Sequence, residues 1–127
     1  MSSDLLIGDK KVPKDCKQYS PIILTCIKNC IKKNINILDY IDESFKYMQV
    51  FSIRRGLEQG LDVSIYADSR FDFNQMEEIR DGLFHNLDVR RYAKPEYNYI
   101  KMRRIKNKMI RLVQLEWPSK RGANYVK

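Results

Sequence analysis

The chain repeats itself every 26 residues. Residues 50–68 align with residues 76–94 without a gap. The matched pairs are Ile53 and Ile79, Arg54 and Arg80, Gly56 and Gly82, Leu57 and Leu83, Leu61 and Leu87, Asp62 and Asp88, Val63 and Val89, Tyr66 and Tyr92, and Ala67 and Ala93. A period of this length is typical of arrays of supersecondary units, which present an extended surface for binding.

The period extends beyond these two copies. Earlier apolar positions in the same register are Ile27, Ile31, Ile35, Ile37 and Tyr40, and later ones are Met102, Ile105 and Met109. We therefore expect about four units, of which the first and last are degenerate. Terminal units of an array turn one face to water and so need a different surface.

Helix start signals occur at the same place in the units. Asp72 with Gln75 three residues later forms the pattern of a capping box. Ser20 followed by Pro21 combines a cap residue with the residue that suits the first helical position. Between start and end, apolar residues follow the spacing of one helical stripe.

Helix end signals recur as well. Gly60 and Asn86 stand where a left-handed residue would end each long helix. Asp62 and Asp88 follow two residues later and can cap a second, shorter helical turn. The sequence therefore predicts an all-α protein, with one long helix and one short helix or turn in each 26-residue unit.

Length and composition predict a single domain. The chain has 127 residues, 43% of them hydrophobic and 31% charged, enough for a modest core. We divide it into an N-terminal arm (1–18), a helical repeat domain (19–117) and a basic C-terminal tail (118–127). No apolar run reaches the ~20 residues of a membrane span, and no signal peptide is recognisable. Three cysteines indicate free thiols in a reducing cytoplasm.

Two residue types in the units are open to both a structural and a functional interpretation. Gly56 and Gly82 lie inside the long helices, where close approach of a neighbouring backbone explains glycine better than a hinge does. Tyr40, Tyr66 and Tyr92 are expected to be buried rings with hydroxyls at the rim. The alternative for the tyrosines is a ladder on which nucleic-acid bases stack.

The positive charge is concentrated at the C-terminal end. Residues 1–97 hold 15 basic and 15 acidic side chains, whereas residues 98–127 hold nine basic ones and a single acid, Glu116. A helix predicted over 98–116 has an apolar stripe and a parallel cationic row. The stripe is Met102, Ile105, Met109 and Leu112. The cationic residues are Lys101, Arg103, Arg104, Lys108 and Arg111.

This cationic row has three interpretations. It could bind nucleic-acid phosphates, with an affinity that falls steeply with salt. It could dock on an acidic protein surface. It could also be a solvated helix face, the usual fate of helix charges. No helix-turn-helix, zinc-finger or ribonucleoprotein motif supports the first interpretation.

A second basic series follows the 26-residue step. Its members are Lys28, Arg54, Arg80 and Lys106. They would form a ladder of cations along one face of the array. We expect local ion pairs with Asp62 or Asp88 instead, because those carboxylates recur with the same period.

Catalytic and metal-binding patterns are sparse. His85 stands at an exposed helix end. Cys26 and Cys30 lie one helical turn apart, but two further zinc ligands at suitable spacing are missing. Phosphate-binding glycine loops and serine elbows are absent from the sequence. We therefore expect no enzyme activity, no metal and no cofactor.

The segments 53–68 and 75–83 resemble a short helical repeat found in phage and conjugative-element proteins of Gram-positive bacteria. The likeness covers roughly residues 45–110, and Asn86 replaces the usual glycine. The repeat has no known activity, so the resemblance implies a setting and no site residues. Small proteins in that setting are often inhibitors of host defence, including anti-CRISPR proteins.

The expected function is therefore non-catalytic binding in the cytoplasm of a bacterial host. The first hypothesis is a phage or mobile-element inhibitor that docks on a host protein or ribonucleoprotein complex. The alternative is an accessory protein that binds DNA or RNA through the basic C-terminal helix. An open edge of the array would also allow a homodimer, and no membrane partner is expected.

Overall fold

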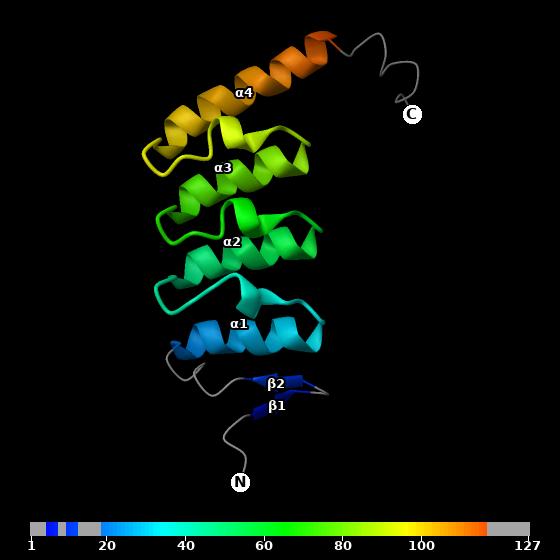
Figure 1. Cartoon of the computed structure of the whole chain (residues 1–127), viewed down its shortest axis with the longest axis vertical. Coiled ribbons are helices and arrows are strands. Elements are labelled where there is room, and N and C mark those ends of the chain that lie inside the picture. The colour runs from blue at the N-terminus through cyan, green and yellow to red at the C-terminus, as the bar shows by residue number, and fades with distance from the viewer. Residues whose placement is uncertain (1–4, 8–9, 13–18, 117–127) are drawn as a thin grey trace.

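A computed structural model describes residues 5–7, 10–12 and 19–116 of the chain. Within this part, four α-helices are stacked along the long axis of the molecule and point the same way (Figure 1). They are α1 (Pro21–Lys32), α2 (Tyr47–Glu58), α3 (Phe73–Phe84) and α4 (Tyr99–Glu116). Short 3-10 helices follow the first three: η2 (Ile37–Asp39), η3 (Val63–Ile65) and η4 (Val89–Arg91). The body of the protein is all-helical, as predicted.

A small β-hairpin precedes the helices. Strands β1 (Leu5–Ile7) and β2 (Lys10–Val12) pair antiparallel, with Leu6 opposite Lys11. The hairpin lies beside α1 at the N-terminal end of the stack (Figure 1). Only an arm was predicted at 1–18, without these strands. The remainder of that arm and the predicted tail at 118–127 lie outside the described residues.

The elements follow the 26-residue step. The helices begin at residues 21, 47, 73 and 99, and the 3-10 helices begin at residues 37, 63 and 89. Each of the first three α-helices is followed by a residue with positive φ, namely Asn34 (65°), Gly60 (75°) and Asn86 (61°). The left-handed positions predicted at Gly60 and Asn86 are confirmed, and asparagine adopts this conformation more readily than most residues do.

The predicted caps are present where side chains can reach the backbone. The Asp72 carboxylate accepts a hydrogen bond from the Gln75 amide at 2.8 Å, and the Gln75 side chain accepts one from the Asp72 amide. Asp62 likewise accepts from the Ser64 amide at the start of η3. Asp88 makes no such bond at η4. Ser20 precedes α1 with Pro21 in the first turn, but its hydroxyl makes no cap bond.

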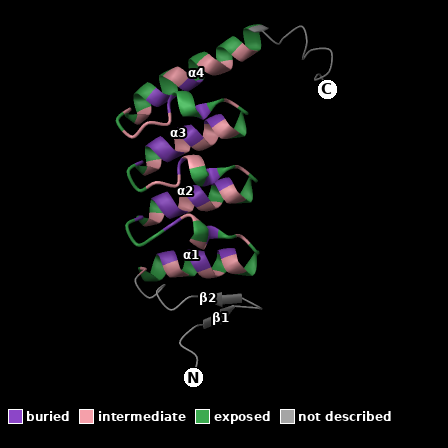
Figure 2. Ribbon diagram, in the orientation of Figure 1, coloured by how far each residue is buried: buried purple, intermediate pink, exposed green. Residues whose placement is uncertain are grey.

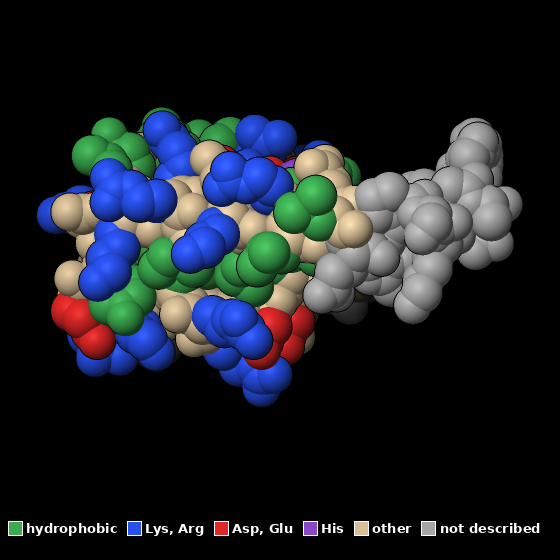
Figure 3. All heavy atoms as spheres, turned by 90° about the horizontal axis from the view of Figure 1, so that it is seen from above, with side chains coloured by type: hydrophobic (Ala, Val, Ile, Leu, Met, Phe, Trp, Pro, Cys, Tyr) green, Lys and Arg blue, Asp and Glu red, His purple; other side chains and the backbone are tan. Residues whose placement is uncertain are grey.

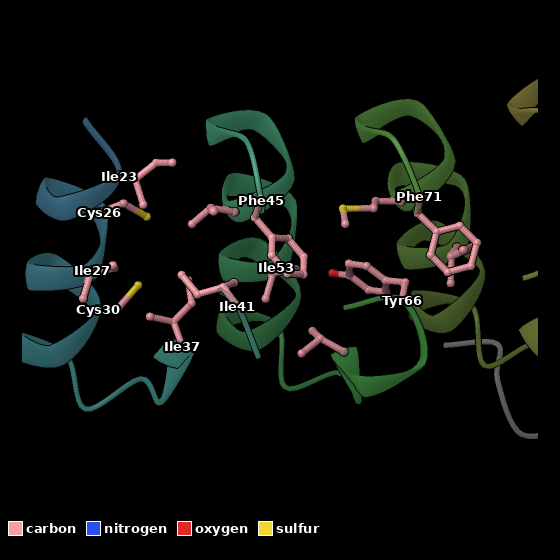
Figure 4. Close-up of a cluster of buried hydrophobic side chains, with 14 of the residues drawn as sticks. Ile23, Cys26, Ile27, Cys30, Ile37, Ile41, Phe45, Ile53, Tyr66 and Phe71 are labelled. Atoms are coloured by element: carbon pink, nitrogen blue, oxygen red, sulfur yellow. The ribbon is translucent and has the colours of Figure 1, made fainter. Parts of the chain in front are cut away.

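The hydrophobic core is continuous from α1 to α4. Each layer places apolar side chains of one helix against the 3-10 helix and loop that follow it (Figure 4). Buried residues lie between the helices and exposed ones around the outside of the stack (Figure 2). The fully buried side chains include Ile27, Ile37, Val50, Ile53, Val63, Tyr66, Met76, Ile79, Val89, Tyr92 and Met102.

Two tyrosines explain the two helical glycines. Tyr66 and Tyr92 are fully buried, and their hydroxyls donate to the carbonyls of Ser52 (2.8 Å) and Glu78 (2.7 Å). A Cβ on Gly82 would lie 2.0 Å from the Tyr92 hydroxyl, and Gly56 meets Tyr66 in the same way. The absence of a side chain at each glycine therefore makes room for a tyrosine side chain. The prediction that a neighbouring backbone approaches these glycines was wrong. These two rings are not accessible for base stacking, and their hydroxyls are not at the rim.

The buried phenols make stability sensitive to alkaline pH. Burial raises the pKa of Tyr66 and Tyr92 well above the ordinary value of about 10. For Tyr66 the hydrogen bond to Ser52 and the charge of Arg80 offset only part of this rise, and for Tyr92 the charges of Glu78 and Asp81 add to it. Their hydrogen-bonded form therefore stabilises the fold fully below pH about 10. That contribution falls as pH rises, because only the unfolded chain ionises readily.

We expect the variant Tyr66→Phe/Tyr92→Phe to be less stable than the wild type by about 1 kcal/mol per tyrosine at pH 8. The gap should close towards pH 11, where the wild type alone loses the phenol contribution. Urea denaturation of both proteins at each pH measures this. A gap that stays constant between pH 8 and pH 11 would contradict the assignment.

Candidate functional site

The last helix differs from the others in length and in its surroundings. It begins at Tyr99, where the Asn98 side chain accepts a hydrogen bond from the Lys101 amide at 2.8 Å. It has 18 residues, whereas α1, α2 and α3 have 12 each. Its C-terminal end therefore extends beyond α3 (Figure 1). In the described part of the chain no element covers its outer side.

The inner side of α4 follows the predicted apolar stripe for only part of its length. Met102 is fully buried, and Ile105 and Met109 are half-buried against the core. Leu112, predicted to belong to the same stripe, is 50% exposed. The reason is that α3 ends at Phe84, which is 26 positions before residue 110, so the last turns of α4 have no helix beneath them.

Two basic residues of α4 anchor it to α3. Arg103 lies 2.9 Å from a Glu78 carboxylate oxygen, and Lys106 lies 2.7 Å from the other oxygen and 2.6 Å from Asp81. Burial lowers the pKa of Lys106, but the hydrogen bonds and charges of Asp81 and Glu78 outweigh it, so the pKa is raised. Arg103 was predicted in the exposed cationic row; it is 55% exposed but pairs with Glu78. Lys106 was predicted to form an ion pair with Asp62 or Asp88, and it pairs with Glu78 and Asp81 instead.

Two further members of the basic ladder form ion pairs within the fold. Arg80 pairs with Glu77 and donates to the Gln59 side chain at 2.8 Å. Arg54 lies 3.9 Å from Glu58 and over the Phe51 ring.

Lys28 is half-buried and has no ion pair within the described residues. Three of the four ladder residues therefore form ion pairs, but their partners are not the predicted Asp62 and Asp88. Asp62 binds Ser64, and Asp88 binds Arg90, because both aspartates lie at the starts of the 3-10 helices.

The other four cations of the predicted row point to solvent. They are Lys101, Arg104, Lys108 and Arg111. Lys101 lies 3.9 Å from the centre of the Tyr97 ring, a cation–π contact. Arg104, Lys108 and Arg111 make no ion pair within residues 19–116. Since nothing in this part of the fold neutralises them, they form an uncompensated cationic surface.

Three of these cations, Lys101, Arg104 and Lys108, occupy positions that are covered in the preceding helix. The residues 26 positions earlier are Gln75, Glu78, Gly82 and His85. Gln75 and Glu78 are 5% and 6% exposed, and Gly82 is buried. His85, the equivalent of Arg111, is exposed. Gln75 donates to the carbonyls of Pro95 (3.0 Å) and Tyr97 (2.6 Å) in the loop before α4. The cationic row therefore lies on the side of α4 that a following unit would cover.

Apolar side chains lie beside the cations. Ile100, Leu112 and Leu115 are 52%, 50% and 72% exposed. On an α-helix, Leu115 continues the row of cations, and Ile100 and Leu112 flank it. Seen from the α4 end, the molecule mixes basic and apolar side chains (Figure 3). We name these seven residues the terminal face: Ile100, Lys101, Arg104, Lys108, Arg111, Leu112 and Leu115.

The sequence contains one signal for this face. In α2 and α3 the position that admits the tyrosine is Gly56 or Gly82, but in α4 it is Lys108. The equivalent position in α1, which η2 follows, is Cys30. A long Lys side chain in place of a small residue therefore distinguishes the last described helix. Exposure of Ile100 and Leu115 was not predicted, because neither belongs to the periodic stripe.

Other candidates offer less. Cys26 and Cys30 are buried in the α1 layer, and His85 lies 3.5 Å from Asp81 at the end of α3. Within the described residues there is no group of three or more His, Cys, Asp or Glu side chains arranged to hold a metal ion. No helix in this part of the chain is long and apolar enough to cross a membrane.

Comparison with known proteins adds no family. The chain matches no protein-family model, and no curated protein or solved structure is significantly similar to it. The resemblance to the phage and conjugative-element repeat therefore stays a hypothesis.

Proposed function

We propose that the chain is an array of about four 26-residue units and acts by binding a partner rather than by catalysis. The even spacing of the helices and 3-10 helices supports this. Equivalent contacts in successive layers, such as the Gly56–Tyr66 and Gly82–Tyr92 pairs, support it too. Arrays of this kind expose long surfaces and use them for recognition.

The terminal face is the docking surface in this proposal, and its partner is an acidic protein surface. The observation that carries it is the row of four exposed cations, three of which stand at positions that are covered in the preceding helix. Three of these cations have no ion pair within the described residues, so an acidic partner would supply one. The exposed Ile100, Leu112 and Leu115 favour protein, because a phosphate backbone offers nothing to apolar side chains.

The setting follows from the resemblance. In a phage or mobile element, the acidic surface would belong to a host protein or a ribonucleoprotein complex in the bacterial cytoplasm. Docking would then inhibit it, as anti-CRISPR proteins do. DNA or RNA is the second candidate, and the unpaired cationic row is the observation in its favour. A homodimer through the terminal face is disfavoured because two cationic faces repel each other.

Charge reversal tests the proposal. The variant Lys101→Glu, Arg104→Glu, Lys108→Glu and Arg111→Glu should lose partners that wild-type protein retains from a nuclease-treated bacterial lysate. A matched control reverses four cations elsewhere: Lys28, Lys32, Lys46 and Arg91. Its net charge is the same, and it should retain the partner. Equal loss in both variants would mean that net charge, and not the terminal face, governs binding.

Binding to short DNA and RNA, both double-stranded and single-stranded, tests whether the partner is a nucleic acid instead of a protein. Under the first proposal, wild-type protein shows no tight binding to them at 150 mM salt. Binding that weakens steeply between 50 and 200 mM salt, and disappears only in the terminal-face variant, would replace the protein partner with nucleic acid.

A further inference from the structure

The α2–α3 and α3–α4 layers share a pattern of contacts that the α1–α2 layer lacks, because α2 has Phe51 at the first of the two positions. In these two layers the lower helix and its C-cap present polar groups to two positions of the helix above, three residues apart. Between α2 and α3, the Ser52 hydroxyl bonds Glu77 at 2.7 Å and Gln59 bonds Arg80 at 2.8 Å.

Between α3 and α4 the same two upper positions are Arg103 and Lys106, which meet Glu78 and Asp81. In both helices each of these positions directly follows an apolar residue of the interface. These apolar residues are Met76, Ile79, Met102 and Ile105.

The sign of the charge is inverted on the terminal face. The position equivalent to Glu78 is Arg104, and the position equivalent to Asp81 is Asn107. In the α3–α4 layer an acidic lower face meets two basic residues. A helix lying on α4 in the same way would meet Arg104, flanked by Lys101 and Lys108. It would need acidic residues where α4 itself carries Arg103 and Lys106.

The terminal face cannot accept another unit of this chain. In α2 and α3 a glycine admits the tyrosine and valine of the following 3-10 helix. Lys108 occupies that position in α4 and fills the space with a long side chain. A second copy docked face to face would oppose cation to cation. The occupant is therefore a different molecule with the opposite charge.

We propose that the terminal face binds an acidic amphipathic helix of a partner protein, lying along α4 where a following helix of the array would lie. Its acidic residues stand three apart, each directly after an apolar residue. The acids meet Lys101, Arg104, Lys108 and Arg111, and the apolar residues cover Ile100, Leu112 and Leu115. This inference rests on the proposed function, because it specifies the shape of the acidic protein surface to which the terminal face is proposed to bind.

The probe is a peptide taken from the chain itself. It spans residues 98–112, with every Lys and Arg replaced by Glu, so that it keeps the α4 spacing and inverts its charge. Fluorescence anisotropy measures its binding to the full chain. We expect it to bind at least about tenfold more tightly than a scrambled peptide of identical composition, because only the ordered one forms an apolar stripe.

Two protein variants test the contacts separately. The four-site charge reversal should weaken binding of the acidic peptide at least tenfold. It should also bind the unmodified cationic 98–112 peptide, which the wild type does not. Leu112→Asn/Leu115→Asn should weaken binding of the acidic peptide without changing its salt dependence, since it removes apolar contacts alone.

Two other outcomes would contradict the proposal that the partner supplies an acidic helix. Equal binding of the ordered and scrambled peptides would overturn it and leave an acidic partner of another shape, so the proposed function would survive. Failure of both peptides to bind would also overturn it. In that case the lysate comparison decides independently whether the terminal face docks on any protein.

Discussion

Replacing Gly82 with alanine is expected to lower the free energy of unfolding by about 2 kcal/mol, although alanine is the better helix former. The added Cβ would lie 2.0 Å from the Tyr92 hydroxyl and 2.7 Å from a methyl carbon of Val89. Tyr92 is fully buried and bonded to the Glu78 carbonyl, so its ring has to give up that bond to move. Overpacking costs about 1–3 kcal/mol and the lost bond about 1, against about 0.8–1 gained in helix propensity.

Urea denaturation of a double-mutant cycle measures this effect. Tyr92→Phe removes the atom that the new Cβ meets first, so Gly82→Ala should cost less in that background than in the wild type. Asn74→Ala is the control, because it changes an exposed position of the same helix. A stability gain from Gly82→Ala, of the size that propensity alone gives, would contradict the packing of Tyr92 into the glycine position.

This glycine illustrates what the sequence could predict. Recurrence of Gly56 and Gly82 at one register indicated a close approach, since glycine inside a helix otherwise costs stability. The sequence did not identify the approaching group, because Tyr66 and Tyr92 lie ten residues further along and meet the glycine only after the chain turns back. A periodic pattern gives the positions of contacts more readily than their partners.

Local signals were the most reliable. The cap at Asp72 and the left-handed positions at Gly60 and Asn86 depend on residues within one turn, and the structure has all three. Partners across layers were predicted poorly. Arg80 and Lys106 pair with carboxylates of α3 and not with Asp62 or Asp88. The stacking of the helices determines the directions of these side chains, and the sequence alone does not show it.

The hairpin was missed for a different reason. Leu5–Ile7 and Lys10–Val12 are three-residue strands, too short to show the alternation that predicts a strand. The two residues between them, Gly8 and Asp9, are of the type that favours a two-residue hairpin turn. That signal was present in the sequence, but the helical period of the remainder outweighed it.

Replacing Lys106 with methionine is expected to lower the free energy of unfolding by about 3 kcal/mol, the largest effect of any single change proposed. Its ammonium lies 2.7 Å from Glu78 and 2.6 Å from Asp81, and its side chain is only 9% exposed. Methionine keeps most of the packing and removes the charge. Glu78, with a side chain that is 8% exposed, would then be buried with Arg103 as its remaining basic partner.

Arg103→Met is the matched control for this prediction. It removes a cation from the same carboxylate, but the Arg103 side chain is 55% exposed, so water screens the pair and the expected cost is about 1 kcal/mol or less. Adding Glu78→Gln to Lys106→Met should recover much of the lost stability, because no buried charge then lacks a partner. Similar costs for the two single variants in urea denaturation would contradict the burial of Lys106.

Hydrogen exchange connects this ion pair to the terminal face. Lys106 points inward from α4, two positions from Arg104 and Lys108, which point outward. If the inner pair holds α4 against α3, Lys106→Met should speed amide exchange in α4 more than in α2, because among the described elements α4 has a neighbour on one side only. Peptide binding to the terminal face should weaken in parallel, since a helix that opens more often presents its cations less often in one arrangement. Faster exchange without weaker binding would mean that the terminal face does not depend on how α4 is anchored.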